Sequence, residues 1–476
     1  MTGKMVLGVA ITIKIALILW LGPLQQPDSG GYIAISTLIR TGGDWMTFVD
    51  LHSIHSSLIR MIGYPSIIAV CRLISDSQWD LILICFQTLV GLIATTLVFQ
   101  AIHAVTRSFY AGVFGAGCYF LSPALQYDLF VLTDSLYGHL LSILTALLVI
   151  WTCEQRPATA VRVLAAGSLL ALALLIRSAT MPLGLLFVAP VAVWVRRSGW
   201  KAGAIAVALF LSPLLATNSA YQGWNKLRSG EAFLAIDTLY ALLQPLIAIE
   251  ARGTPTFTDN ATLDVTARTI FALEHGPTRA MMGPDAFTIG DHLILKDGLP
   301  AVEALRIVKA RFFRVMLTHP IAFARNMAYE LTTSVLFSTF DPLRVMRLLL
   351  SYRYDVDWLD ARHEFLKHPV REWRIAGVTF LILETASRIL GLLLLLGALV
   401  ALPLHLMPAA RGDRDAALLV AMVIVAAGFI GVTAMIHLEE RYIIGIYPAL
   451  YIAAIPTLMT RLRNFRTGLR KREPLS

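Results

Sequence analysis

Apolar stretches of nearly membrane-spanning length recur along most of this 476-residue chain. A helix needs about 20 consecutive apolar residues to cross the hydrocarbon core of a bilayer, and about ten stretches here approach that length. Inside lipid the backbone has to satisfy its own hydrogen bonds, which favours helices. We therefore expect an all-α polytopic membrane protein, with spans near 5–24, 79–104, 109–125, 136–153, 161–176, 180–195, 202–217, 375–403, 416–436 and 442–460.

The composition excludes several other classes of protein. Hydrophobic residues make up 57% of the chain and charged residues 15%, whereas an ordinary soluble domain is about one quarter charged. This rules out a soluble enzyme and a disordered chain. The net charge of +9 does not indicate nucleic-acid binding, because the basic residues lie mainly between apolar runs and in the tail 461–476. The four cysteines have no paired spacing, so neither a disulfide framework nor a zinc site is predicted.

Positive charge predicts the orientation of the chain. The stretch 61–75 is apolar but short, and Pro65 and Arg72 interrupt it, so we expect a re-entrant or interfacial helix there. If 61–75 is not counted as a membrane crossing, the basic loops and the tail fall on the same side as Lys4. That side is predicted to be the cytoplasm. Both termini are predicted to lie there. The stretch 5–24 is taken as an uncleaved first span, because no small-residue cleavage site follows it.

The segments 25–78, 126–135, 177–179 and 218–374 then fall on the extracytoplasmic face. The last of them is too long for a structureless loop, so we expect a small outer domain. The predicted organisation is an N-terminal transmembrane catalytic module (1–217) with outer loops 25–78 and 126–135, the outer domain (218–374), the C-terminal transmembrane helices (375–460) and a basic cytoplasmic tail (461–476).

Two parts of the predicted outer domain have an apolar pattern. Leu305, Val308, Phe312 and Val315 recur at helical spacing, and this stripe is a candidate for lying on the bilayer surface. The apolar run 329–350 could be an eleventh crossing. An Asp-Pro pair breaks that run in the middle, so we place it in the outer domain.

Two outer loops carry an acidic residue close to an expected membrane boundary. Asp28 lies in the segment PDSGGY (27–32), where glycines free the backbone, and Asp134 lies in the segment TDS (133–135). Carboxylates in these places could point into one polar site. The alternative is that Asp28 and either Thr133 or Asp134 only cap helices, since Asp, Ser and Thr are good N-cap residues.

Two arginines lie at a matching depth. Arg177 ends the fifth span and Arg441 opens the tenth, against the inward bias of positive charge in this chain. Such arginines are candidates for binding an anion. The alternatives are snorkelling to the membrane surface or pairing with Glu439 or Glu440.

A metal site is not expected. Asp50, His52 and His55 are close in sequence, but the spacing supplies no further strong ligand. His52 and His55 are the one exception to this expectation, because two histidines three residues apart can share a helical face.

Four pieces of the chain, in this order, carry a family resemblance: PDSGGY (27–32), the helix that begins at GYP (63–65), the Arg177 segment, and the closing ERY (440–442) with Pro448. They resemble the C-type (GT-C) membrane glycosyltransferases. That group includes protein O-mannosyltransferases and the bacterial aminoarabinose transferase of lipid A. The resemblance covers the membrane half and its loops but not 218–374. The chain departs from the family in having Ser29 after Asp28, where Asp-Glu is common, and Asp134 where a Glu is common.

The resemblance implies transfer of a sugar from a polyprenyl-phosphate donor to a glycan, lipid or protein acceptor. The resemblance gives Asp28 the role of catalytic base. Together with the residue types, it makes Asp134 the residue that orients the acceptor or Asp28. Arg177 and Arg441 are then the groups that hold the donor phosphate. Transfer would be inverting, with no obligatory cofactor and no divalent metal. Tyr32, Tyr64, Glu440 and Tyr442 are candidates for the acceptor or sugar pocket. The expected location is a bacterial inner membrane, with the site facing the periplasm.

Three other functions stay open at this point. A transporter would also suit many spans with charge inside them, although the sequence has no internal symmetry and its candidate polar residues gather at one face. An acyltransferase would need a histidine base, for which His139 or His437 could serve. An O-antigen ligase would use a diphosphate lipid, and no motif here separates its chemistry from transfer of a single sugar.

Overall fold

The computed structural model describes residues 3–25, 28–42, 60–122, 127–196, 199–259, 261–274, 284–334, 366–367, 369–436 and 440–470. Over these ranges the secondary structure is helical, apart from one isolated bridge between Leu24 and Phe130. The all-α class predicted from the sequence is therefore confirmed.

A helix coincides with each of the apolar stretches predicted to cross the membrane. These helices are α1 (Gly3–Leu21), α5 (Trp79–Thr106), α6 (Phe109–Phe120), α8 (Thr133–Cys153), α9 (Ala160–Ile176), α10 (Met181–Val195), α11 (Gly199–Ser229), α19 (Arg371–Ala410), α20 (Arg414–Ile436) and α21 (Tyr447–Arg470). In the described part of the chain, seven helices are long and apolar enough to cross a membrane. The stretches 5–24, 109–125 and 161–176 coincide instead with shorter apolar helices.

The bundle has a buried centre and an apolar outer surface. The most hydrophobic part of α8 is 72% buried, whereas that of α11 is only 17% buried, so α8 lies centrally and α11 at the periphery. Exposed leucines and isoleucines cover the outer helices, for example Leu393, Leu396 and Leu399 on α19. Helices that are apolar on their exposed side are expected of a protein surrounded by lipid.

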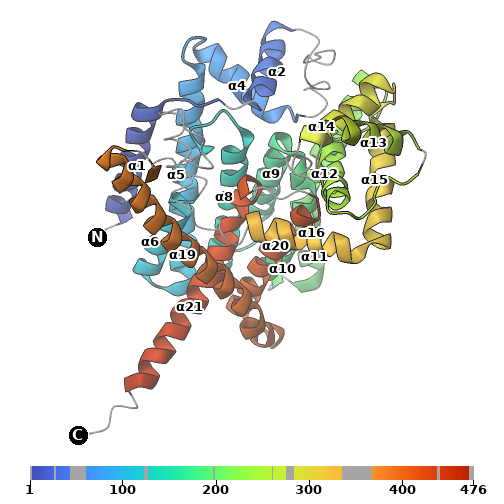
Figure 1. Ribbon diagram of the computed structural model, residues 1–476. Coiled ribbons are helices and arrows are strands. Elements are labelled where there is room, and N and C mark those ends of the chain that lie inside the picture. Colours follow the sequence, from blue (N-terminus) through green and yellow to red (C-terminus); the bar gives the residue numbers. More distant parts are fainter. Residues whose placement is uncertain are drawn as a thin grey trace.

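Two helices of the first outer loop, α2 (Ser29–Thr41) and α4 (Gly63–Ile74), lie together at the upper end of the bundle in Figure 1. With 12 residues, α4 is about 18 Å long, too short to cross a hydrocarbon core of about 30 Å. Gly63 lets its first turn pack against α9, since a Cβ there would lie 2.6 Å from the carbonyl oxygen of Leu175. The segment 61–75 thus contains a short helix that packs on the bundle, and its place relative to a bilayer stays a prediction.

A second group of helices lies at the right of Figure 1 and has its own hydrophobic core. It comprises α12 (Asp237–Ala251), α13 (Thr262–Glu274), α14 (Pro284–Asp291), the π-helix η3 (His292–Lys296), α15 (Ala301–Thr318) and α16 (Pro320–Ser334). We call this group the outer unit. The peripheral helix α11 continues to Ser229 before the chain enters it.

The stripe on α15 is buried in the outer unit rather than presented to a bilayer. Val308, Phe312 and Val315 are all buried in the second core, where Leu305 packs against them. The expectation that this stripe lies on the membrane surface is therefore wrong: its apolar face is covered by α12 and its neighbours. The run 329–350 extends beyond the end of α16 into residues 335–350, which lie outside the described residues, so its predicted place stays untested.

Candidate active site

Backbone hydrogen bonds bring the two acidic outer loops together. The amide of Leu24, just after α1, donates to Leu129 O at 2.8 Å, and the amide of Val131 donates to Leu24 O at 2.9 Å. The chain leaving α1 therefore runs beside the chain entering α8. This pairing brings Asp28 and Asp134 to the wall of one cavity, although they are far apart in sequence.

Neither carboxylate caps a helix. Asp28 occupies the N-cap position of α2 but has helical backbone angles (φ −63°, ψ −25°) and makes no capping hydrogen bond. The N-cap of α8 is Leu132, and it too has no side-chain cap, so Thr133 and Asp134 lie in the first turn. The capping alternative is therefore wrong at both places, and each carboxylate is engaged by an arginine instead.

Arg60 is the partner of Asp28, and the sequence did not single it out. Its Nη2 donates to Asp28 Oδ1 at 2.9 Å and its Nη1 to Tyr32 Oη at 3.0 Å. The guanidinium carbon lies 4.6 Å from the centre of the Tyr32 ring, a stacking geometry that fixes the arginine. Arg60 precedes α4 and α4 is docked on the bundle, so the first outer loop supplies both members of this pair.

Arg177 is the partner of Asp134. Its Nη1 donates to Asp134 Oδ1, and its guanidinium carbon lies 5.8 Å from the centre of the Tyr137 ring. Arg177 has an extended backbone between the end of α9 and the short 3₁₀-helix η1 (Ser178–Thr180), which directs the side chain away from α9. The Asp134 side chain is only 3% exposed and that of Arg177 20%.

The predicted tyrosines take different places. Tyr32 lines the cavity, and its hydroxyl lies 3.4 Å from Thr133 Oγ1. Tyr64 lies behind Tyr32, in an edge-on ring contact with centroids 5.2 Å apart. The Tyr64 hydroxyl donates to Gln87 Oε1 at 2.7 Å, and the Gln87 amide donates to the carbonyls of Asp128 and Phe130. Tyr64 thus supports the loop before α8 and does not itself line the cavity.

Several predicted residues lie outside the described part of the chain. The backbone of 440–446 forms the 3₁₀-helix η4, but the side chains of Glu440, Arg441 and Tyr442 are not among the described ones. The same holds for Asp50, His52 and His55. Their roles stay predictions. Among the described residues, no group of three or more histidine, cysteine or carboxylate side chains could hold a metal ion.

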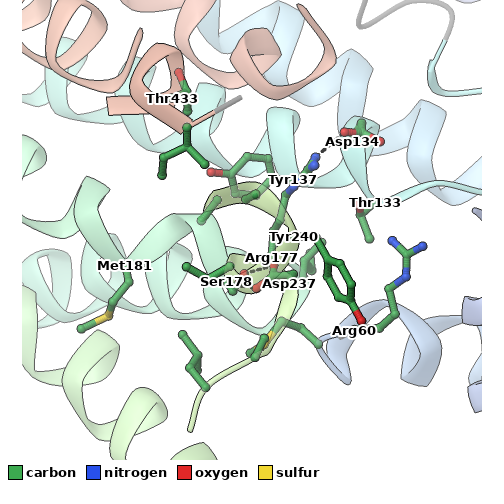
Figure 2. A pocket seen from close by; sticks show the side chains of 18 of the residues that line it. Arg60, Thr133, Asp134, Tyr137, Arg177, Ser178, Met181, Asp237, Tyr240 and Thr433 are labelled. Carbon is green, nitrogen blue, oxygen red and sulfur yellow. Dashed lines mark hydrogen bonds and ion pairs between the residues drawn. The ribbon is translucent and has the colours of Figure 1, made fainter. Parts of the chain in front are cut away.

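All four residues of these two ion pairs line a cavity of about 490 Å³. Figure 2 shows Arg60, Asp134 and Arg177 at this cavity. One end is polar and the other is walled mainly by apolar side chains of α10 and α20, helices long and apolar enough to cross a membrane. The polar end is lined by Asp28, Tyr32, Arg60, Thr133, Asp134, Tyr137, Arg177 and Ser178, and the α10 and α20 wall by Met181, Pro182, Phe429, Val432, Thr433 and Ile436. The shape and chemistry fit an elongated ligand that is charged at one end and apolar at the other.

A third carboxylate completes the cavity. Asp237, in the first turn of α12, accepts a hydrogen bond from Ser178 Oγ and lines the wall contributed by the outer unit (Figure 2). Burial raises the pKa of Asp237 above its ordinary value, against the opposing effects of Ser178, Arg177 and Arg60. Sequence reasoning missed this residue because nothing next to Asp237 along the chain marks it, and only the tertiary fold brings it beside Ser178.

A separate cluster of buried charges lies behind the loop before α8. Lys14 Nζ and His139 Nε2 both contact the Asp128 carboxylate, the latter at 2.6 Å, and Tyr119 Oη lies 2.7 Å from His139 Nδ1. Burial alone would raise the pKa of Asp128, but Lys14 and His139 outweigh it and hold the pKa at about 2. Both ring nitrogens of His139 are engaged here, and His139 does not line the cavity, which argues against an acyltransferase base at this position.

No family model and no curated protein matches the sequence. Among solved structures, the chain is similar to the archaeal oligosaccharyltransferase AglB from Archaeoglobus fulgidus in complex with an inhibitory peptide and a dolichol-phosphate. The identity is 12% over 99% of this chain and 52% of that chain, with a TM-score of 0.47, and the apo form of the same protein gives the same values. The chain thus spans about half the length of AglB.

A further similarity is to ArnT from Cupriavidus metallidurans bound to undecaprenyl phosphate, at 14% identity over 95% of this chain and 78% of that chain, with a TM-score of 0.34. Both similarities extend over nearly the whole of this chain, and both are to GT-C enzymes, the class that the sequence resembles. At these identities and TM-scores they stand as resemblances.

Proposed function

We propose that this chain is a membrane glycosyltransferase that moves a sugar from a polyprenyl-phosphate donor to an acceptor. The observation that carries the proposal is the cavity in which two carboxylate–arginine pairs meet an apolar wall of two candidate membrane spans. A polyprenyl-phosphate sugar has the matching parts: a lipid tail, one phosphate and a polar sugar. Dolichol phosphate and undecaprenyl phosphate, which the two solved structures hold, are lipids of this class.

The arginines are suited to the donor phosphate. A planar guanidinium donates two parallel hydrogen bonds to phosphate oxygens and keeps its charge at any physiological pH. Arg60 and Arg177 both line the cavity, and each retains part of its side-chain surface uncovered. Arg60 therefore takes, in this proposal, a share of the role first predicted for Arg441.

Asp28 acts as the base. The acceptor hydroxyl or amine gives its proton to Asp28 while its oxygen or nitrogen attacks the anomeric carbon, and the bond from that carbon to the phosphate oxygen breaks. The electron pair leaves with the lipid phosphate, whose charge changes from about −1 to −2, while Asp28 becomes neutral. Arg60 loses its partner at the moment when the phosphate gains charge, so it can stabilise the leaving group. One such displacement inverts the anomeric carbon.

Asp134 has a supporting role. Its carboxylate is held by Arg177 and almost enclosed, which suits a group that orients its neighbours better than one that exchanges protons with substrate. The reaction needs no redox cofactor. We expect no obligatory metal, an active site on the extracytoplasmic face, cytoplasmic termini, and a glycan, lipid or protein as the acceptor.

The test uses the purified full-length chain and a panel of radiolabelled polyprenyl-phosphate sugars. Asp28→Asn should lower transfer by about 10³-fold or more, because the amide cannot accept the proton, with the folded fraction unchanged. Asp76→Asn is a matched control: Asp76 lies after α4 in the same predicted outer loop and pairs with Arg40, but its side chain is 63% exposed and it does not line the cavity.

Four results would count against the proposal. Activity that survives Asp28→Asn would remove the base. No transfer from any monophosphate donor by folded wild-type protein would overturn the function as stated. Transfer from a diphosphate-linked glycan alone would identify a ligase, and release of labelled substrate across a vesicle without chemistry would identify a transporter.

A further inference from the structure

The cavity wall contributed by α12 consists of side chains on one face of that helix. Asp237, Ala241 and Gln244 follow one another at spacings of four and three residues, which puts them on one helical face, and all three line the cavity. Thr238 and Tyr240 flank that face and also line the cavity. The wall therefore offers a carboxyl, an amide and a hydroxyl group around the small side chain of Ala241, which leaves space between them.

An aromatic surface adjoins this face. The rings of Tyr240 and Phe287 stack with centroids 4.7 Å apart and planes inclined by 25°. Tyr240 is buried and its hydroxyl donates to Asp291 Oδ1 at 2.9 Å, which fixes the ring, whereas Phe287 is 45% exposed and lines the cavity. An exposed ring held from behind by a second ring can pack against the weakly positive C–H groups of a ligand.

The position of this wall relative to the arginines limits what it can bind. Ser178 directly follows Arg177 in the chain, and its hydroxyl donates to Asp237 (Figure 2). Arg177 and Arg60 both act electrostatically on the Asp237 carboxyl group. A group bound against Asp237 is therefore close to whatever anion the arginines hold. In a polyprenyl-phosphate sugar, a single oxygen joins the sugar to the phosphate.

We propose that Asp237, Gln244 and Ser178, together with the Phe287 ring, form the subsite for the transferred sugar, with Asp237 as the residue that selects among sugars by hydrogen bonding to one hydroxyl. We call these four residues the sugar subsite. This inference rests on the proposed function. A sugar ring has hydroxyl groups at its rim and C–H groups on its faces, so the rim faces the carboxyl and amide groups and one face rests on Phe287.

The carboxyl of Asp237 is well placed for selection. It is tied to Ser178 on one side, so its orientation is set before a ligand arrives. A site built to hydrogen-bond a substrate hydroxyl rejects the analogue that lacks it far more strongly than an apolar site rejects an extra group, because the site's own polar atom is then left without a partner. Loss of the carboxyl should therefore matter for one hydroxyl and not for the others.

The experiment combines donor analogues with a protein variant. Transfer is measured for wild type and Asp237→Ala with the parent donor and with a set of donors that each lack one sugar hydroxyl. Asp237→Ala should lower kcat/KM for the parent donor about 10²-fold, but only a fewfold for one particular deoxy donor. For the other deoxy donors the loss should equal that of the parent. Glu303→Gln, an exposed carboxyl on α15 that pairs with Arg306, should leave every value unchanged.

A second variant tests the aromatic part of the subsite. Phe287→Leu should raise the KM of the sugar donor about tenfold, yet leave inhibition by the bare polyprenyl phosphate unchanged, because the bare lipid has no sugar to rest on the ring. Equal weakening of both ligands would show that Phe287 supports the whole cavity.

The outcomes separate this inference from the proposed function. If wild type transfers sugar but Asp237→Ala loses the same factor on every donor, the sugar subsite is wrong and the proposed function stands. If the loss of activity in Asp237→Ala varies with the acceptor analogue and not with the donor analogue, the α12 wall binds the acceptor and the inference is wrong. If wild type transfers from no polyprenyl-phosphate sugar, the proposed function fails first.

Discussion

Buried charge occurs in two forms in this molecule. In the cluster formed by Lys14, Asp128 and His139, Lys14 Nζ and His139 Nε2 both contact the Asp128 carboxylate, and none of the three residues lines the cavity described above. Asp128 is fully buried and Lys14 nearly so. Burial of a charge is costly, and pairing with good geometry offsets that cost. We call this the closed cluster. It joins α1 to the loop before α8.

The pairs at the cavity, Arg60 with Asp28 and Arg177 with Asp134, use the same kind of contact but border a space large enough for a ligand. Asp28 is 38% exposed and Arg60 26% exposed, so both can exchange their partner for a substrate atom. Pairing alone therefore does not mark a functional charge. A functional charge is marked by a partly exposed side chain that borders a cavity. The closed cluster should control stability, and the cavity pairs should control binding.

The largest effect is expected from breaking the closed cluster. Lys14→Met leaves Asp128 buried with a weakened set of partners, which should lower the free energy of unfolding by about 3 kcal/mol. Thermal or denaturant unfolding of the full-length chain in detergent measures this. The double variant Lys14→Met/Asp128→Asn removes both charges and should recover most of the loss. If the double variant is no more stable than the single one, the pair contributes through packing and not through charge.

A smaller effect, on binding, is expected at the cavity. Arg60→Gln removes one of the two guanidinium groups that face the proposed phosphate and should weaken binding of polyprenyl phosphate by about 2 kcal/mol, a factor of about 30. Titration calorimetry in detergent measures the Kd. The free energy of unfolding should change much less than for Lys14→Met, because Asp28 is partly exposed and can be solvated. A large loss of stability with an unchanged Kd would erase the distinction between the two groups.

The sequence predicted those features that depend on local pattern. Apolar length marked the helices of the bundle, and the position of Asp28, Asp134 and Arg177 at the ends of apolar runs marked residues that the structure brings to one cavity. The length of an apolar run did not give the length of the helix inside it. The stretch 109–125, for example, contains α6, which ends at Phe120 and has only 12 residues.

The missed residues depend on contacts between distant segments. Arg60 and Asp237 lie where no local motif marks them, and their roles follow only from tertiary neighbours. Lys14 lies inside an apolar run, where its partner Asp128 is more than a hundred residues away. The stripe on α15 shows the converse: helical spacing predicts that a face is covered, but does not say whether lipid or protein covers it.

The smallest predicted effect concerns pH, because the fully buried Asp128 and the half-buried Asp237 have pKa values shifted in opposite directions. The paired Asp128 has a lowered pKa, whereas burial raises the pKa of Asp237 above its ordinary 3.8. Asp237 is therefore neutral at low pH and gains its charge only as the pH rises through its raised pKa. That charge repels the donor phosphate, so donor affinity should fall as the pH rises over this range.

At a separation of about 8 Å and an effective dielectric constant near 40, the repulsion amounts to about 1 kcal/mol, or a factor of about five in Kd. The sugar donor is the right ligand, because its phosphate diester keeps one charge throughout, and the Asp28→Asn variant allows equilibrium binding to be measured without turnover. Adding Asp237→Asn should make Kd independent of pH over this range, since the amide does not titrate. A pH dependence that persists in Asp28→Asn/Asp237→Asn would contradict the assignment of this titration to Asp237.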